Sequence, residues 1–353
     1  ATTRAITGLG FKPDIVWAKV RNASYQHMFM TSTVGTNKVG HTQSTSAWDN
    51  NFAYGYCSSF DSDGFTVQAG STSIENLNEL NKTYVGWGWK CGGAPTATNS
   101  ASIGAVPTAG SVMIDGVAST DAVAGNMLTK KLSANTKSGV STSIYLGNGG
   151  AGGQFAHGLG KVAEFVLHKR INSSDSWIGC WMIGGQDPVS CNMSSSNAIS
   201  SDSTYSSQQN TSTLSMANGS GARNTGSEDH FSMVVTSIPG MTSVGRYKGN
   251  GAAGAAGTMV ELGFRPAFLM LKSATNGQWW VIHDSARDNG YNRIDERLFP
   301  NGDAASDTNG ELEFHATGFK FYSGSENIDD AYHYYVAFAD QPALFANAAL
   351  NNI

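Results

Sequence analysis

The feature of this sequence that most constrains its fold is a motif that occurs three times. Each copy is a glycine-containing turn followed by a short, mostly apolar run that ends on lysine. The copies lie at residues 8–19, 158–169 and 261–272. Such a run is too short for a helix and is typical of a buried strand flanked by turns. A motif repeated in this way predicts a chain built from similar units.

The three units also resemble one another in their later parts. Each ends on an aromatic or β-branched run that favours a strand, at 84–89, 231–235 and 335–339. Asp-Gly and Thr-Gly steps at 63–64 and 317–318 precede alternating apolar residues, which indicates hairpins, whereas the second unit lacks this glycine. The predicted fold class is therefore all-β, with three repeated β-sandwich units of jelly-roll or lectin-like type in series.

The spacing of the copies predicts the domain map. The first two copies are further apart than the last two, and the residues between them are rich in Ala, Ser, Thr and Gly. We therefore expect a semi-ordered connector that holds a hairpin but no core of its own. The predicted segments are unit one at 1–94, the connector at 95–139, unit two at 140–240, unit three at 241–343 and a C-terminal tail at 344–353.

A second short motif distinguishes unit one from the others. Tyr-x-Gly-Asn-Gly precedes units two and three, at 145–149 and 247–251, and has no counterpart ahead of unit one. Unit one is therefore expected to lack its opening strand. The first residues, Ala-Thr-Thr-Arg, contain no signal-peptide pattern, which indicates a processed product or part of a longer chain.

The repeated strand motif also predicts which side chains are buried. Because successive side chains of a strand point to opposite faces, one set is expected between the sheets and the other near the surface. The residues expected in the core are Trp17, Leu167 and Leu271, with Trp87 and Phe338 in the closing strands. The residues expected near the surface are Lys19, Lys169 and Lys272.

Composition excludes several functional classes. Only 14% of the residues are charged and the net charge is −5, whereas an ordinary soluble domain has roughly 25% charged residues. The absence of a basic run argues against nucleic-acid binding. No run approaches the roughly 18 apolar residues of a membrane-spanning helix, so membrane insertion is not expected. The cysteines show no metal-binding spacing and are expected as free thiols: Cys57, Cys91, Cys180 and Cys191.

The sequence offers no convergent set of catalytic residues, so we expect no enzyme, no cofactor and no metal site. Asp61 and Asp63 resemble the start of a calcium loop, but the remaining carboxylates of such a loop are missing. A hairpin turn is the favoured reading there, with a calcium ion as the alternative. Asp284 and Arg287 are interpreted as an ion pair that fixes a loop after a strand.

A polar loop in unit three is the one candidate recognition site. It contains Tyr291, Asn292 and Arg293 directly after a glycine. Aromatic, amide and guanidinium groups in one exposed loop suit contact with sugars or with a protein surface. The same composition also occurs in loops that are merely solvated, and that reading stays open.

The order of these motifs is similar to that in the repeated β domains of virion appendage proteins, of the tail-fibre and tail-spike type, from marine and cyanobacterial tailed phages. The similarity extends over essentially the whole chain. It departs most in unit two, which keeps the strand around Trp177 but loses the hairpin glycine. The segments that carry it include 8–19, 59–67, 84–90, 93–100, 131–136 and 337–342, together with the Tyr-x-Gly-Asn-Gly steps.

The resemblance implies a structural and adhesive protein of the virion surface. Its expected partners are copies of itself, most simply as a homotrimer, other virion proteins, and a host-surface glycan or protein. Low charge independently favours association, because charge keeps proteins apart in solution. The alternative is a secreted, non-catalytic carbohydrate-binding protein, which would be a monomer.

Overall fold

The computed structural model describes residues 3–50, 53–72, 76–206, 209–217, 221–275, 277–288, 293–310, 312–322 and 326–340. The predicted all-β class is confirmed, since 41% of the described residues are in strands and 2% are in helices. The helical elements are α1 (Gly221–Asn224) and a 3₁₀ turn (Gly254–Ala256). The C-terminal tail predicted at 344–353 lies outside the described residues.

Unit three shows the architecture in full. One antiparallel sheet has the order β18-β25-β20-β21, and a second sheet has the order β19-β24-β23-β22. Leu269, Leu271, Phe314 and Phe319 form part of the core between them. The strands are β18 (Thr242–Lys248), β19 (Met259–Glu261), β20 (Pro266–Ser273), β21 (Trp280–Asp284), β22 (Arg293–Ile294), β23 (Leu312–His315), β24 (Gly318–Phe321) and β25 (Tyr332–Ala339).

Unit two repeats this order and extends it. Its main sheet contains β10-β17-β12-β13, and further strands on both sides bring the sheet to nine, while β11 and β16 pair in a second sheet. The unit's own strands are β10 (Val140–Leu146), β11 (Gln154–Ala156), β12 (Phe165–Arg170), β13 (Ile178–Trp181), β14 (Val189–Asn192), β15 (Ser200–Ser201), β16 (Thr213–Ser215) and β17 (Asp229–Val235).

The segment 95–139 is part of the unit-two sheet. It contains β7 (Val112–Ile114), β8 (Val117–Ala118) and β9 (Thr129–Asn135), and β9 pairs antiparallel with β10. The expectation of a semi-ordered connector without a core is wrong, because its apolar side chains enter the unit-two core. Small residues serve this strand well, since β9 packs closely on the neighbouring backbone. The side chains that this segment contributes to the apolar cluster are Val112, Met127, Leu132 and Ala134.

Unit one has the same order with one strand fewer. Its main sheet is β6-β2-β3, whereas its second sheet is β1-β5-β4. Among the described residues, no strand takes the place beside β6 that β10 and β18 take in the other units. The strands are β1 (Thr3–Thr7), β2 (Ile15–Val20), β3 (Met28–Thr31), β4 (Tyr56–Asp61), β5 (Gly64–Gln68) and β6 (Tyr84–Trp89).

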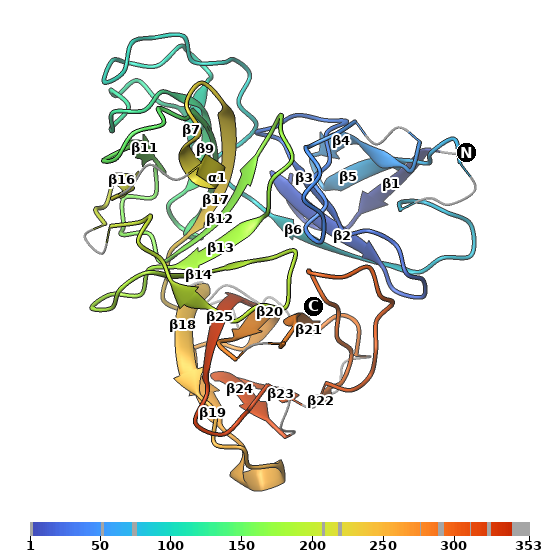
Figure 1. Cartoon of the computed structure of the whole chain (residues 1–353). Coiled ribbons are helices and arrows are strands. Elements are labelled where there is room, and N and C mark those ends of the chain that lie inside the picture. The colour runs from blue at the N-terminus through green and yellow to red at the C-terminus, as the bar shows by residue number, and fades with distance from the viewer. Residues whose placement is uncertain are drawn as a thin grey trace.

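The three units lie against one another (Figure 1), and side chains from all three form one common apolar core. Alternate residues of β2, β12 and β20 face this core, whereas the residues between them face each unit's own second sheet. Trp17, Leu167 and Met270 take equivalent places in it. Leu271 is buried between the two sheets of unit three, as predicted. It lies one residue beyond Met270, however, and so does not share the position of Trp17 and Leu167, which face the common core and not the second sheets of their own units.

Backbone hydrogen bonds join the units in a ring. The amide of Trp48 in unit one donates to the carbonyl of Ile171 in unit two at 3.0 Å. Gly277 of unit three donates to Ser196 of unit two at 3.0 Å, and Ser306 of unit three donates to Arg21 of unit one at 2.8 Å. Each unit therefore contacts both of the others, although the units are consecutive in the chain.

The lysines that end the repeated motif are buried. Lys19, Lys169 and Lys272 are 0%, 1% and 0% exposed, so the expectation that they lie near the surface is wrong. Each stands two residues after Trp17, Leu167 or Met270, and alternation places it on the same inward face.

Backbone carbonyls satisfy these ammonium groups. Lys169 Nζ donates to the carbonyls of Asp175 at 2.6 Å and Thr45 at 3.0 Å, and the second of these lies in unit one. Lys272 Nζ donates to the Gln278 carbonyl at 2.7 Å. Burial lowers the pKa of Lys19 and of Lys169 to about 8. These side chains thus hold the loops that follow the motif strands.

Replacing Trp87 should destabilise the protein strongly. Its ring centroid lies 6.0 Å from that of Trp17 and 5.5 Å from that of Phe268 in unit three, and its Nε1 donates to Asp284 at 3.1 Å. Trp87→Ala should cost about 3–5 kcal/mol of unfolding free energy, measured by denaturant titration. Trp279→Ala, at an exposed tryptophan, is the control and should cost less than about 1 kcal/mol. An unchanged denaturation midpoint for Trp87→Ala would contradict this packing.

Candidate ligand-binding site

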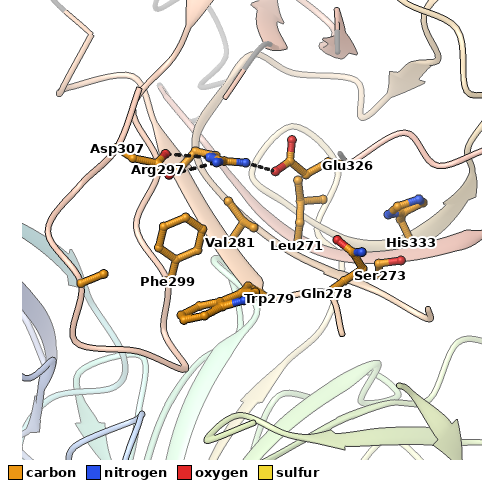
Figure 2. A pocket seen from close by; sticks show the side chains of 11 residues that line it. Leu271, Ser273, Gln278, Trp279, Val281, Arg297, Phe299, Asp307, Glu326 and His333 are labelled. Atoms are coloured by element: carbon orange, nitrogen blue, oxygen red, sulfur yellow. Dashed lines mark hydrogen bonds and ion pairs between the residues drawn. The ribbon is translucent and has the colours of Figure 1, made fainter. Parts of the chain in front are cut away.

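A hollow of about 330 Å³ opens in unit three, where β20 ends and β21 and β25 begin (Figure 2). Its walls come from the strand ends and from the loop between β22 and β23. It combines an exposed aromatic ring with charged and polar groups. The lining residues are Leu271, Ser273, Gln278, Trp279, Val281, Arg297, Phe299, Ala304, Asp307, Glu326 and His333.

Trp279 forms an aromatic wall of the hollow. It is 47% exposed, whereas the adjacent Trp280 is fully buried and stacks on Trp181 of unit two. Phe299 meets the Trp279 ring edge-on, with centroids 5.3 Å apart. Gly302 lies so close that a Cβ there would come 2.6 Å from Cζ3 of Trp279. The ring is therefore held in position while part of it stays open to solvent.

Arg297 organises the charged side of the hollow. It makes a two-pronged ion pair with Asp307, at 2.8 and 3.0 Å, and donates to Glu326 at 3.0 Å (Figure 2). Burial by itself would raise the pKa of Asp307, but the hydrogen bonds and charge of Arg297 outweigh it and lower that pKa. Both carboxylates are thus held by one guanidinium, which suits fixed polar contacts with a ligand better than proton transfer.

His333 contributes a buried imidazole. It is 1% exposed, and its ring stacks on Tyr247 with centroids 5.0 Å apart. Burial lowers its pKa to about 4, so the ring is neutral at neutral pH. Its Nε2 has no hydrogen-bond partner among the described residues. A buried nitrogen without a partner is costly, and a polar ligand group in the hollow would satisfy it.

These groups together make the hollow a candidate recognition site. An exposed aromatic face takes an apolar surface, and fixed polar groups beside it take hydroxyls or amides. The sequence analysis missed all of them. The one available signal was the pair Trp279-Trp280, because two consecutive tryptophans in a strand-like run must face opposite ways.

Of the three loop residues predicted from the sequence, only Arg293 lies within the described residues. Tyr291 and Asn292 lie outside the described residues. Arg293 is on β22, is 57% exposed at its side chain and pairs with Asp295 at 2.8 Å. It does not line the hollow.

The carboxylates at the β4–β5 hairpin serve the backbone and nearby hydroxyls. Asp63 accepts from the amides of Gly8 at 3.0 Å and Gly10 at 2.6 Å. Asp61 accepts from the hydroxyls of Ser59 at 2.8 Å and Thr66 at 2.6 Å. The expected hairpin is confirmed. No cluster of three or more potential metal ligands occurs in the part of the chain that the structure describes.

Two further expectations are confirmed. Arg287 Nε donates to Asp284 at 2.5 Å, and the amides of Ala286 and Arg287 bond to the same carboxylate. The pair therefore fixes the loop after β21, as predicted. The cysteines are free and buried: Cys57, Cys91, Cys180 and Cys191.

The fold is that of an all-β protein of three sandwich units, with an open, partly aromatic hollow in the third. The chain belongs to the family described as "Domain of unknown function (DUF7483)", whose model matches residues 1–115 and 114–342. No curated protein and no solved structure matches the chain. Within the described residues, no helix has the length and hydropathy needed to span a membrane.

The low pKa of His333 predicts acid sensitivity. Its folded pKa of about 4 lies below the unfolded value of about 6.5. The unfolded state therefore binds more protons between these values, and stability should fall as the pH falls from 6.5 to 4. His333→Gln should make this fall shallower in urea titrations at pH 7, 5.5 and 4.5. The control is His315→Gln, at a half-exposed side chain, and equal slopes for the two variants would contradict the prediction.

Proposed function

We propose that the chain is a non-catalytic attachment component of a tailed-phage particle, and that its unit-three hollow binds a host-surface glycan. The observation that carries the binding part is the fixed, half-open ring of Trp279 beside Arg297, Asp307 and His333. The sugar ring would lie on the indole face, and its hydroxyls would bond to the polar groups. The virion location follows from the sequence resemblance.

The arrangement of the units supports a durable exterior role. The three units share one core. Lys169, which ends the motif in unit two, donates hydrogen bonds to a backbone carbonyl of its own unit and to one of unit one. Large and apolar interfaces of this kind resist relative motion of the units. A binding hollow on such a frame is held at a fixed place relative to the rest of the particle.

Substitution of Trp279 tests the glycan proposal. Trp279→Ala should weaken binding of purified host polysaccharide at least about tenfold, because the stacking surface is lost. Trp279→Phe should retain most of the affinity. Tyr332→Ala is a matched control at another exposed aromatic residue of the same unit, which does not line the hollow. Equal affinity for Trp279→Ala and the unmodified protein, by calorimetric titration, would contradict the proposal.

We further propose that copies of the chain associate, with a trimer as the arrangement suggested by the resemblance. The segment 95–139 carries three exposed aliphatic side chains, Ile103 at 54%, Val106 at 55% and Val117 at 69%. Exposed apolar side chains are typical of contact surfaces where they form a patch, and we propose that these three belong to one. Deletion of this segment would remove β9 from the unit-two sheet, so point substitutions are the suitable test.

The assembly state separates the two functional alternatives. Light scattering at micromolar concentration should give the mass of three chains. Ile103→Asp with Val117→Asp should give the mass of one chain while the folded signal in circular dichroism is kept. Thr108→Asp, in the same segment, is the control. A monomeric unmodified protein would favour the secreted carbohydrate-binding alternative, which uses the same hollow and needs no partner copy.

A further inference from the structure

Unit one has an open sheet edge where the other two units have a strand. In unit two β10 pairs with β17, and in unit three β18 pairs with β25. The equivalent strand of unit one, β6, ends its sheet. No strand of the described residues pairs with its outer edge. An edge of this kind presents unpaired backbone groups that can accept a further strand.

The two strands present in the other units are anchored in the same way. Tyr145 and Tyr247 are buried, and each hydroxyl donates to a backbone carbonyl at 2.6 Å, that of Arg223 and that of Glu326 respectively. The two rings stack on His230 and His333. The tyrosine of the Tyr-x-Gly-Asn-Gly motif thus anchors the strand on its unit, because its ring is buried and its hydroxyl is hydrogen-bonded.

The asparagine of the motif makes a second common anchor. The backbone N–H of Asn148 donates to Asn224 Oδ1 at 2.8 Å. The backbone N–H of Asn250 donates to Asn327 Oδ1 at 3.1 Å. Unit one has a Glu-Asn-Leu sequence ending at Leu77 that is similar to the Glu-Asn-Ile sequence ending at Ile328. Its asparagine, Asn76, is buried, and its Oδ1 accepts from the backbone amide of Gln26 at 3.2 Å. A carbonyl oxygen can accept a second hydrogen bond, so we expect Asn76 to take the place that Asn327 has in unit three.

The space beside β6 is open toward the core of unit one. A hollow of about 600 Å³ lies there, lined by apolar residues that include Ile6, Phe65, Val67 and Leu77. Gly86 borders it, and a Cβ on Gly86 would lie 3.5 Å from the Phe65 ring. In units two and three the corresponding space holds the buried tyrosine of the motif, Tyr145 or Tyr247.

The space is also open toward unit three. A second hollow, of about 780 Å³, is lined by Trp87, Trp89, Phe268 and Ala286 among others. In unit two the corresponding face of β10 is covered by unit one, where the hydroxyls of Thr142 and Thr33 bond at 2.5 Å. Thr31 of unit one and Asp284 of unit three hold equivalent positions in their strands. Thr33 and Ala286 each lie two residues further along the chain, so Ala286 is the counterpart in unit three of Thr33. A strand beside β6 would therefore fill both hollows.

We propose that the edge of β6 is the acceptor for one more strand of the Tyr-x-Gly-Asn-Gly type, carried by polypeptide joined ahead of β1. The connections in the other units argue for this source. Short links, residues 147–153 and 249–258, join β10 to β11 and β18 to β19. β1 is the counterpart of β11 and β19, because each pairs with a strand of its unit's second sheet.

The chain supplies its own probe for this proposal. Residues 242–251 form a complete strand of the required type and can be fused ahead of residue 1 through a short Gly-Ser linker. The fusion should raise the melting temperature by about 5 °C or more, since it adds a paired strand and fills two hollows. A fusion of the same residues in scrambled order should not. Equal melting temperatures for the two fusions would overturn the proposal.

Peptide binding gives the second readout. The free peptide 242–251 should bind the unfused chain in calorimetric titration. The Tyr247→Ala peptide should bind at least about tenfold more weakly. Neither peptide should bind the protein that carries the fused strand 242–251, because its edge is already occupied. Gly86→Arg should block binding by filling the hollow, whereas Gly184→Arg, at another uncrowded glycine, should not. If the peptide binds but the fusion does not raise the melting temperature, the strand does not come from polypeptide joined ahead of β1. That result would overturn the proposal and indicate a strand from a separate partner.

Discussion

The structure depends on one apolar core that no unit could complete alone. Residues of β2, β12 and β20 meet there with residues of the closing strands, and aromatic contacts such as Trp181 with Trp280 cross from one unit to another. The main sheet of each unit is therefore buried on both faces, by the unit's own second sheet and by the other units. This explains why nearly continuous apolar runs, and not simple alternation of apolar and polar residues, mark the motif strands.

Repetition and strand chemistry were sufficient to predict the all-β class and the existence of similar units, because both are local properties. The burial of Lys19, Lys169 and Lys272 was missed, because a lysine is seldom fully buried and the accepting carbonyls come from loops, in one case of another unit. The core contribution of Leu132 and Ala134 was missed because the segment around them is rich in small residues, which were taken as too poor for a core. Their value depends on the close approach of the neighbouring backbone.

The candidate site shows the same division between local and long-range information. The pairing of Asp284 with Arg287 was predictable, since the residues lie three apart at a strand end. The hollow around Trp279 was not, because Arg297, Asp307, Glu326 and His333 come from separate elements that only the folded sheets bring together. The proposed recognition hollow of unit three thus lies at the ends of strands that also take part in the shared core.

The most direct test of the shared core is the cooperativity of unfolding, measured by differential scanning calorimetry. Because each unit uses the others to cover its main sheet, the account predicts one transition in which the calorimetric and van't Hoff enthalpies agree. Trp87→Ala should move that single transition without splitting it. Separate transitions for the individual units would contradict the claim that the three sandwiches fold around one core.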